Sequence, residues 1–197
     1  MLRTLDDATL DTTVPVDVVT HLRRSTMVSD FRMQQLARRL QDVVAGFRDA
    51  GIPVLLLKGA AVGALTDPSF RSRPMTDLDV LIAREDVPRA RPVLLATGWP
   101  ETTDPVLLEM LQDQHHLPHF VDPQMPGVRL ELHVASLPVD HSFALDDREL
   151  WSTSREAGAP FAGARLPSPE LFVLHACIHF GWAHTMRFGV WRTIRAI

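Results

Sequence analysis

The chain has 197 residues, of which 46% are hydrophobic and 22% charged, and its formal net charge is −4. This composition is typical of a globular protein with one domain or slightly more, and it excludes a disordered chain. The mild acidity gives no overall attraction to nucleic acid or to an anionic membrane, so a polyanionic partner would need a local basic patch. A single cysteine, Cys177, excludes an internal disulfide. With no apolar leader or membrane span in the pattern, we expect a cytoplasmic protein.

Residues 1–50 are predicted to form an N-terminal leader followed by an amphipathic helix. The leader covers residues 1 to about 15. From Asp30 onward, apolar residues recur at helical spacing until Gly51 and Pro53 end the segment. The residues that define the apolar face are Met33, Leu36, Leu40, Val43, Val44 and Phe47.

Residues 51–140 are predicted to form the core domain. The run from Val54 to Leu57 is continuously apolar, which indicates a buried strand that ends at Lys58 and Gly59. After it, the pattern predicts in chain order a helix over 60–65, a strand over 77–83, helices over 85–96 and 105–114, and a hairpin of strands 119–121 and 128–134.

Residues 141–197 are predicted to be a crossover segment followed by C-terminal helices. Residues 135–166 are rich in proline, glycine and alanine, so we expect an irregular crossing there. Helices are predicted over 171–183 and 186–197. The last helix lacks a stop signal, which leaves open whether this helical part is truncated.

Two carboxylates stand at positions i and i+2 of the predicted strand over 77–83. Side chains alternate between the two faces of a strand, so Asp77 and Asp79 are expected to point the same way. Like charges held this close repel each other unless a cation lies between them, and a divalent metal is the usual one.

Three motifs in this order carry a resemblance to a known family. The chain resembles an uncharacterised bacterial nucleotidyltransferase family of the DNA polymerase beta superfamily, through Leu57-Lys58-Gly59, Arg73-Pro74-Met75-Thr76-Asp77-Leu78-Asp79 and Glu131-Leu132-His133. The resemblance implies an α/β (α+β) nucleotidyltransferase fold, with a small mixed β-sheet flanked by helices and a C-terminal helical part.

The resemblance also implies a role for each acidic residue. Asp77 and Asp79 would bridge two Mg²⁺ ions, or Mn²⁺ in their place, and Glu131 would be the third carboxylate ligand. All three would be the catalytic residues of the site. Carboxylate and phosphate oxygens are the ligands that Mg²⁺ prefers. His133 shares a strand face with Glu131 and is expected to orient a ligand, or else to be a partly buried structural histidine.

Nucleotide binding is predicted at the end of the first strand. Lys58 offers a compact positive charge to the phosphates, and Gly59 lets the backbone approach them. Arg73 either contacts phosphate or pairs with an aspartate. Most of the superfamily has Gly-Ser where this chain has Lys58 and Gly59, a departure shared with the family named above.

The expected activity is Mg²⁺-dependent transfer of a nucleoside monophosphate from an NTP, such as ATP, to an acceptor hydroxyl. A small molecule or a protein is favoured over nucleic acid as the acceptor. The alternative is a protein of this fold without that activity: a nucleotide-binding module, an antitoxin-like partner-binding module or a repurposed biosynthetic enzyme. For either reading, a homo-oligomer or a partner chain is a candidate to complete the C-terminal side.

The other histidines do not predict a metal site. Pro118 interrupts any helix that would align His115 and His119, and no cysteine accompanies them or His116, so zinc is not expected there. His175 and His179 are four residues apart on a predicted helix, and we expect both to pack near the cleft.

Overall fold

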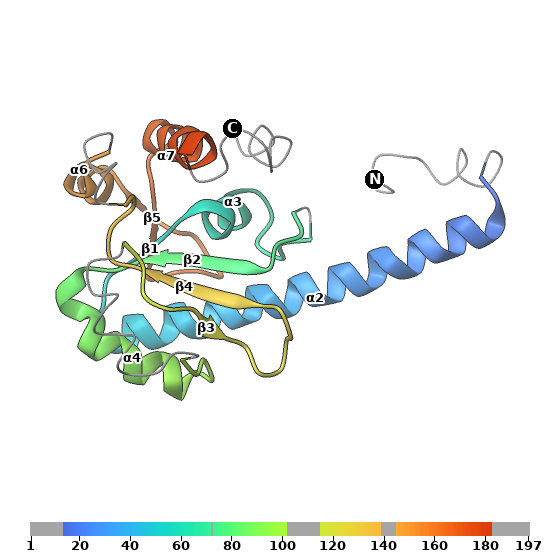
Figure 1. Ribbon diagram of the computed structural model, residues 1–197, viewed down its shortest axis with the longest axis horizontal. Coiled ribbons are helices and arrows are strands. Elements are labelled where there is room, and N and C mark those ends of the chain that lie inside the picture. The colour runs from blue at the N-terminus through green and yellow to red at the C-terminus, as the bar shows by residue number, and fades with distance from the viewer. Residues whose placement is uncertain (1–13, 72, 102–114, 139–144, 183–197) are drawn as a thin grey trace.

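A computed structural model of the protein describes residues 14–71, 73–101, 115–138 and 145–182, and it shows a mixed sheet between two layers of helices (Figure 1). This architecture confirms the predicted α/β fold with a mixed β-sheet flanked by helices. The helices predicted over 105–114 and 186–197 lie outside the described residues. No helix in the described part of the chain is long and apolar enough to cross a membrane.

Six strands form the sheet in the order β3-β4-β2-β1-β6-β5. The pairs β2–β4 and β1–β6 are parallel, and the other neighbours are antiparallel. The predicted hairpin is confirmed as β3 paired with β4. The strands are β1 (Val54–Leu56), β2 (Asp77–Leu81), β3 (Phe120–Val121), β4 (Arg129–His133), β5 (Arg155–Glu156) and β6 (Ala164–Leu166).

The helices cover both faces of the sheet. Figure 1 shows α2 and α4 on one side and α3, α6 and α7 on the other, with the N-terminal half of α2 extending past the sheet. Leu78 and Val80 of β2 belong to the larger core cluster with α2, while Leu55, Leu57 and Leu81 pack with α6 and α7. The helices are α2 (Val16–Asp49), α3 (Lys58–Thr66), the 3-10 turn η2 (Arg84–Asp86), α4 (Val87–Ala96), α6 (Asp147–Ser152) and α7 (Pro169–Trp182).

Helix α2 has the predicted apolar face but is longer than its periodicity indicates. All six predicted apolar positions from Met33 to Phe47 are buried. The helix begins at Val16 rather than near Asp30. Its first half buries only Val19, so no apolar stripe marks it in the sequence.

The segment expected to cross irregularly contains α6, β5 and β6, so that expectation was wrong for its described part. Strand β6 pairs in parallel with β1, with Val54 opposite Ala164. Strands of two and three residues are too short to show an alternating pattern, and only their pairing in the folded sheet defines them. The predicted domain boundary at residue 140 stays a prediction, although two strands of the sheet come from beyond it.

Candidate metal and nucleotide site

The register of β2 and β4 places two carboxylates side by side. Asp79 is directly opposite Glu131 in this parallel pair. Their neighbours Leu78, Val80 and Leu130 are fully buried on the other face of the sheet, so alternation turns both acids toward the α3 side. Asp79 is only 3% exposed, whereas Glu131 is partly exposed. The fold therefore buries one acid of the pair and leaves the other open to a ligand.

Lys58 supplies a positive charge to this pair from the end of β1. Its Nζ lies 2.8 Å from Asp79 Oδ1 and 3.7 Å from Glu131 Oε2. The Leu57 amide donates to the Asp79 carbonyl at 3.0 Å, which fixes the chain just before the lysine. Lys58 itself has a φ of +42°, a conformation that costs a residue with a side chain about 1–2 kcal/mol. Such strain is typical of functional positions, where the surrounding structure maintains it.

His133 approaches the same two carboxylates from β4. Its Nε2 lies 3.0 Å from Asp79 Oδ1 and 3.6 Å from Glu131 Oε2. Its Nδ1 is buried and has no hydrogen-bond partner among the described residues. In a metal-ligating histidine, the ring nitrogen that does not bind the metal nearly always donates a hydrogen bond to a protein group or water. Because Nδ1 lacks such a partner here, His133 is better suited to donate a hydrogen bond from Nε2 to Asp79 than to bind a metal. That geometry supports the predicted orienting role of His133, which stays a prediction.

These contacts keep both acids ionised. Burial alone would raise the pKa of Asp79, but the His133 hydrogen bond and the Lys58 charge together hold it well below its usual value. His133 also lowers the pKa of Glu131, with Lys58 adding to the effect, against opposition from burial and from the Asp79 charge. The pair therefore carries two negative charges at neutral pH.

The donor atoms present fit a divalent metal. Ligand atoms of Asp79, Glu131 and His133 all lie within 4.8 Å of one another. Mg²⁺ is commonly held by one or two carboxylates together with substrate phosphates, and the two acids alone meet that need. The identity of the ion stays a prediction. Mn²⁺ would accept the same two carboxylates, and a metal that favours imidazole would need His133 as a ligand in addition.

Asp77 lies outside this group of ligand atoms. It is opposite Arg129 in the β2–β4 register and is partly exposed. Its Oδ1 accepts hydrogen bonds from the Thr76 hydroxyl at 2.9 Å and from the Thr76 amide at 3.2 Å. The structure thus brings Asp79 and Glu131 together as expected, while a metal role for Asp77 stays a prediction.

Gly59 and Arg73 lie together at the start of α3. A Cβ atom on Gly59 would be 2.6 Å from Arg73 Nη1 and 3.2 Å from Met75 Sδ. The glycine therefore allows the Arg73 guanidinium group to pack against the helix N-terminus, next to Lys58. This placement supports the prediction that the three residues serve one binding function, which itself stays untested.

Three further histidines lie beside the acidic pair, a position that the sequence analysis did not predict. His119 Nδ1 is 3.5 Å from Glu131 Oε1. The rings of His115 and His116 each lie with centroids 5.6 Å from that of His133. Burial and neighbouring positive charge lower the pKa of His115 to about 4, and burial lowers that of His119. The hairpin register contained the signal, because pairing Phe120 with Leu130 places His119 next to Glu131.

The fold and this cluster together define an α/β protein of the nucleotidyltransferase type, with an acidic pair on adjacent strands and a lysine at the strand-to-helix junction. The chain belongs to the uncharacterised nucleotidyltransferase family, whose model matches residues 1–192. This membership confirms the predicted family and supports a nucleotidyltransferase-type function. The searches found no matching curated protein and no matching solved structure.

Proposed function

We propose that the protein transfers a nucleoside monophosphate from an NTP to an acceptor hydroxyl. In this reaction the acceptor oxygen bonds to the α-phosphorus, the bond to the bridging oxygen breaks, pyrophosphate leaves and the hydroxyl proton passes to water. The observation that carries the proposal is the pairing of Asp79 with Glu131 beside Lys58, at the junction of β1 and α3.

In this proposal the acidic residues bind the metal and the basic residues bind the phosphates. Asp79 and Glu131 would hold a divalent metal, Mg²⁺ by preference, and Asp77 would join them when the nucleotide is bound. When bound, the metal would lower the pKa of the acceptor hydroxyl and neutralise charge at the phosphates. Lys58 would turn from the carboxylates to the β- and γ-phosphates, where Gly59 and Arg73 add contacts. His133 would hold Asp79 in place.

A test follows pyrophosphate release from each NTP with Mg²⁺ and a cell extract as the source of acceptor. We expect release by the wild type and a loss of about 10²-fold or more in Asp79→Asn. Asp49→Asn is the matched control, because this exposed carboxylate at the end of α2 pairs, among the described residues, only with the neighbouring Arg48. Equal release by wild type and Asp79→Asn would contradict the proposal.

A second candidate function has one observation in its favour. The Lys58 ammonium already neutralises part of the acidic pair without a metal, which is compatible with a protein that binds nucleotides or a partner without turnover. Under that alternative, the protein would bind NTP but release no pyrophosphate, and Asp79→Asn would leave NTP affinity unchanged.

A further inference from the structure

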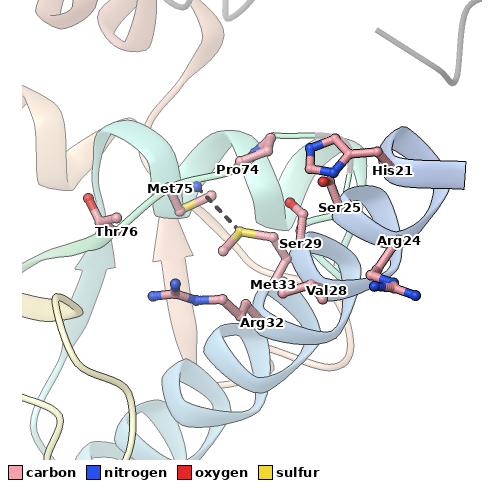
Figure 2. Close-up of a pocket in the computed structure, with 10 residues that line it drawn as sticks. All are labelled: His21, Arg24, Ser25, Val28, Ser29, Arg32, Met33, Pro74, Met75 and Thr76. Carbon is pink, nitrogen blue, oxygen red and sulfur yellow. Dashed lines mark hydrogen bonds between the residues drawn. The ribbon is translucent and has the colours of Figure 1, made fainter. Parts of the chain in front are cut away.

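We propose that a groove between α2 and the residues preceding β2 binds the acceptor, a small molecule that carries an anionic group; this inference rests on the proposed function. The groove has a volume of about 490 Å³. It is lined by α2 residues between His21 and Met33 and by Pro74, Met75 and Thr76 (Figure 2). We call it the basic groove. Its volume is in the range of small-molecule sites.

The charge of the basic groove opposes that of the whole chain. Its lining includes Arg24 and Arg32 together with His21, and it includes no aspartate or glutamate, although the chain carries a net charge of −4. Among the described residues, Arg24 makes no hydrogen bond or ion pair. Arg32 donates one hydrogen bond, to the Pro126 carbonyl at 3.2 Å, so its remaining guanidinium N–H groups can donate to a ligand. Two guanidinium groups without a carboxylate partner favour an anion.

The remaining lining suits an organic molecule rather than a bare ion. Ser25, Ser29 and Thr76 contribute hydroxyl groups. Met33 and Met75 form an apolar floor, where the Met75 amide donates to the Met33 sulfur at 3.3 Å (Figure 2). A ligand with an acidic group and an apolar portion would use both kinds of contact.

The position of the basic groove points to the acceptor rather than the nucleotide. Its residue Thr76 is bonded to Asp77 and donates to that carboxylate. Another lining residue, Met75, lies against the nucleotide site, because a Cβ atom on Gly59 would be 3.2 Å from Met75 Sδ. The basic groove therefore borders the N-terminus of α3, at the end of the sheet where β2 begins. The phosphates of the nucleotide are instead assigned to Lys58 and Gly59. A molecule anchored by the arginines could therefore present its hydroxyl to the acidic pair.

The test measures binding by titration calorimetry of the full chain with phenyl phosphate, benzoate and uncharged phenol. We expect phenyl phosphate, benzoate or both to bind, and phenol to bind at least tenfold more weakly. Comparing phenyl phosphate with benzoate distinguishes a phosphate ligand from a carboxylate ligand. Arg24→Gln/Arg32→Gln should weaken the bound acid about tenfold or more. The control Arg23→Gln/Arg38→Gln removes the same charge from exposed positions of α2 outside the basic groove, and it should leave the affinity for the same probe unchanged.

Several outcomes would overturn this inference. They are failure of both acids to bind, equal weakening in the two double variants, or a larger effect of Arg24→Gln/Arg32→Gln on ATP affinity than on acid affinity. Acid binding and pyrophosphate release are measured separately, so the two proposals can fail separately. If the protein releases pyrophosphate but Arg24→Gln/Arg32→Gln binds the anionic probe as well as the wild type does, only the acceptor site is contradicted. If the probe binds through these arginines but no pyrophosphate is released, the proposed function is contradicted.

Discussion

The Lys58 ammonium lies 2.8 Å from Asp79 Oδ1. The side chain that is predicted to bind phosphate therefore contacts a carboxylate that is predicted to bind metal. The same nitrogen is 3.7 Å from Glu131. A lysine in this position competes with a metal ion in the absence of nucleotide. With NTP bound, its charge would be available to the phosphates.

Replacing this lysine should therefore change metal affinity and activity in opposite directions. In Lys58→Gln, the carboxylates lose their cation, so we expect tighter Mn²⁺ binding without nucleotide, by titration calorimetry. Transfer should nevertheless fall by about 10²-fold, since a charge on the phosphates is lost. Lys58→Arg, which keeps the charge, is the control. Weaker Mn²⁺ binding in Lys58→Gln would show that the lysine does not compete for the carboxylates.

The backbone at Lys58 gives a prediction about stability. Because its φ is +42°, a glycine there should be more stable than an alanine, by about 1 kcal/mol, although both lose the ammonium group. Urea unfolding of Lys58→Gly and Lys58→Ala measures the difference, and the lost ion pair cancels between them. An alanine variant as stable as the glycine variant would mean that the position is not strained.

Asp77 and Asp79 should differ in metal binding. Only Asp79 lies in the group of ligand atoms with Glu131. Without nucleotide, Asp79→Asn should weaken Mn²⁺ binding about tenfold or more, whereas Asp77→Asn should bind like the wild type. Adding a non-hydrolysable NTP should then reveal a defect in Asp77→Asn. If Asp77→Asn already loses affinity without nucleotide, both aspartates hold the first ion.

His175 should make the protein less stable in mild acid. This residue is 1% exposed, and its Nε2 lies 3.1 Å from the Ser136 carbonyl. Burial, with help from the Lys58 charge, lowers the pKa of His175 from 6.5 to about 4. Between these two pH values the unfolded chain binds a proton at His175 that the folded chain does not bind. The free energy of unfolding therefore decreases as the pH is lowered from 6.5 to 4, by on the order of 3 kcal/mol.

Urea unfolding at several pH values tests the role of His175. The variant His175→Gln keeps a donor near the Ser136 carbonyl but does not titrate. Its stability should depend less on pH between 6.5 and 4 than that of the wild type, while other histidines contribute equally to both. Identical pH dependence in the two proteins would rule out His175 as a source of the acid sensitivity.

Alternation along a strand was enough to predict that Asp77 and Asp79 share a face. Glu131 was predicted to join them only because the family resemblance implies it, and the β2–β4 register places it opposite Asp79. The apolar face of α2 from Met33 to Phe47 followed from helical periodicity in the same way. The hairpin of β3 and β4 followed from a short strand pattern and an alternating strand pattern on either side of a proline- and glycine-containing turn.

The rest depends on contacts that no local pattern contains. The positive φ of Lys58 turns its ammonium group onto Asp79, and a sequence does not reveal such a backbone conformation at a non-glycine residue. Strands β5 and β6 are defined by pairing with each other and with β1. The basic groove forms between α2 and Met75, which are far apart in the chain.

The most direct test of the central claim compares ATP or another NTP labelled at the α-phosphate with the same NTP labelled at the γ-phosphate. Each is incubated with the protein, Mg²⁺ and an acceptor fraction. We predict that the α-label enters a product, that the γ-label leaves as pyrophosphate, and that Asp79→Asn abolishes both. Transfer of the γ-label to product, or no Asp79-dependent transfer of the α-label with any NTP, would contradict the assignment of this acidic pair to nucleotidyl transfer.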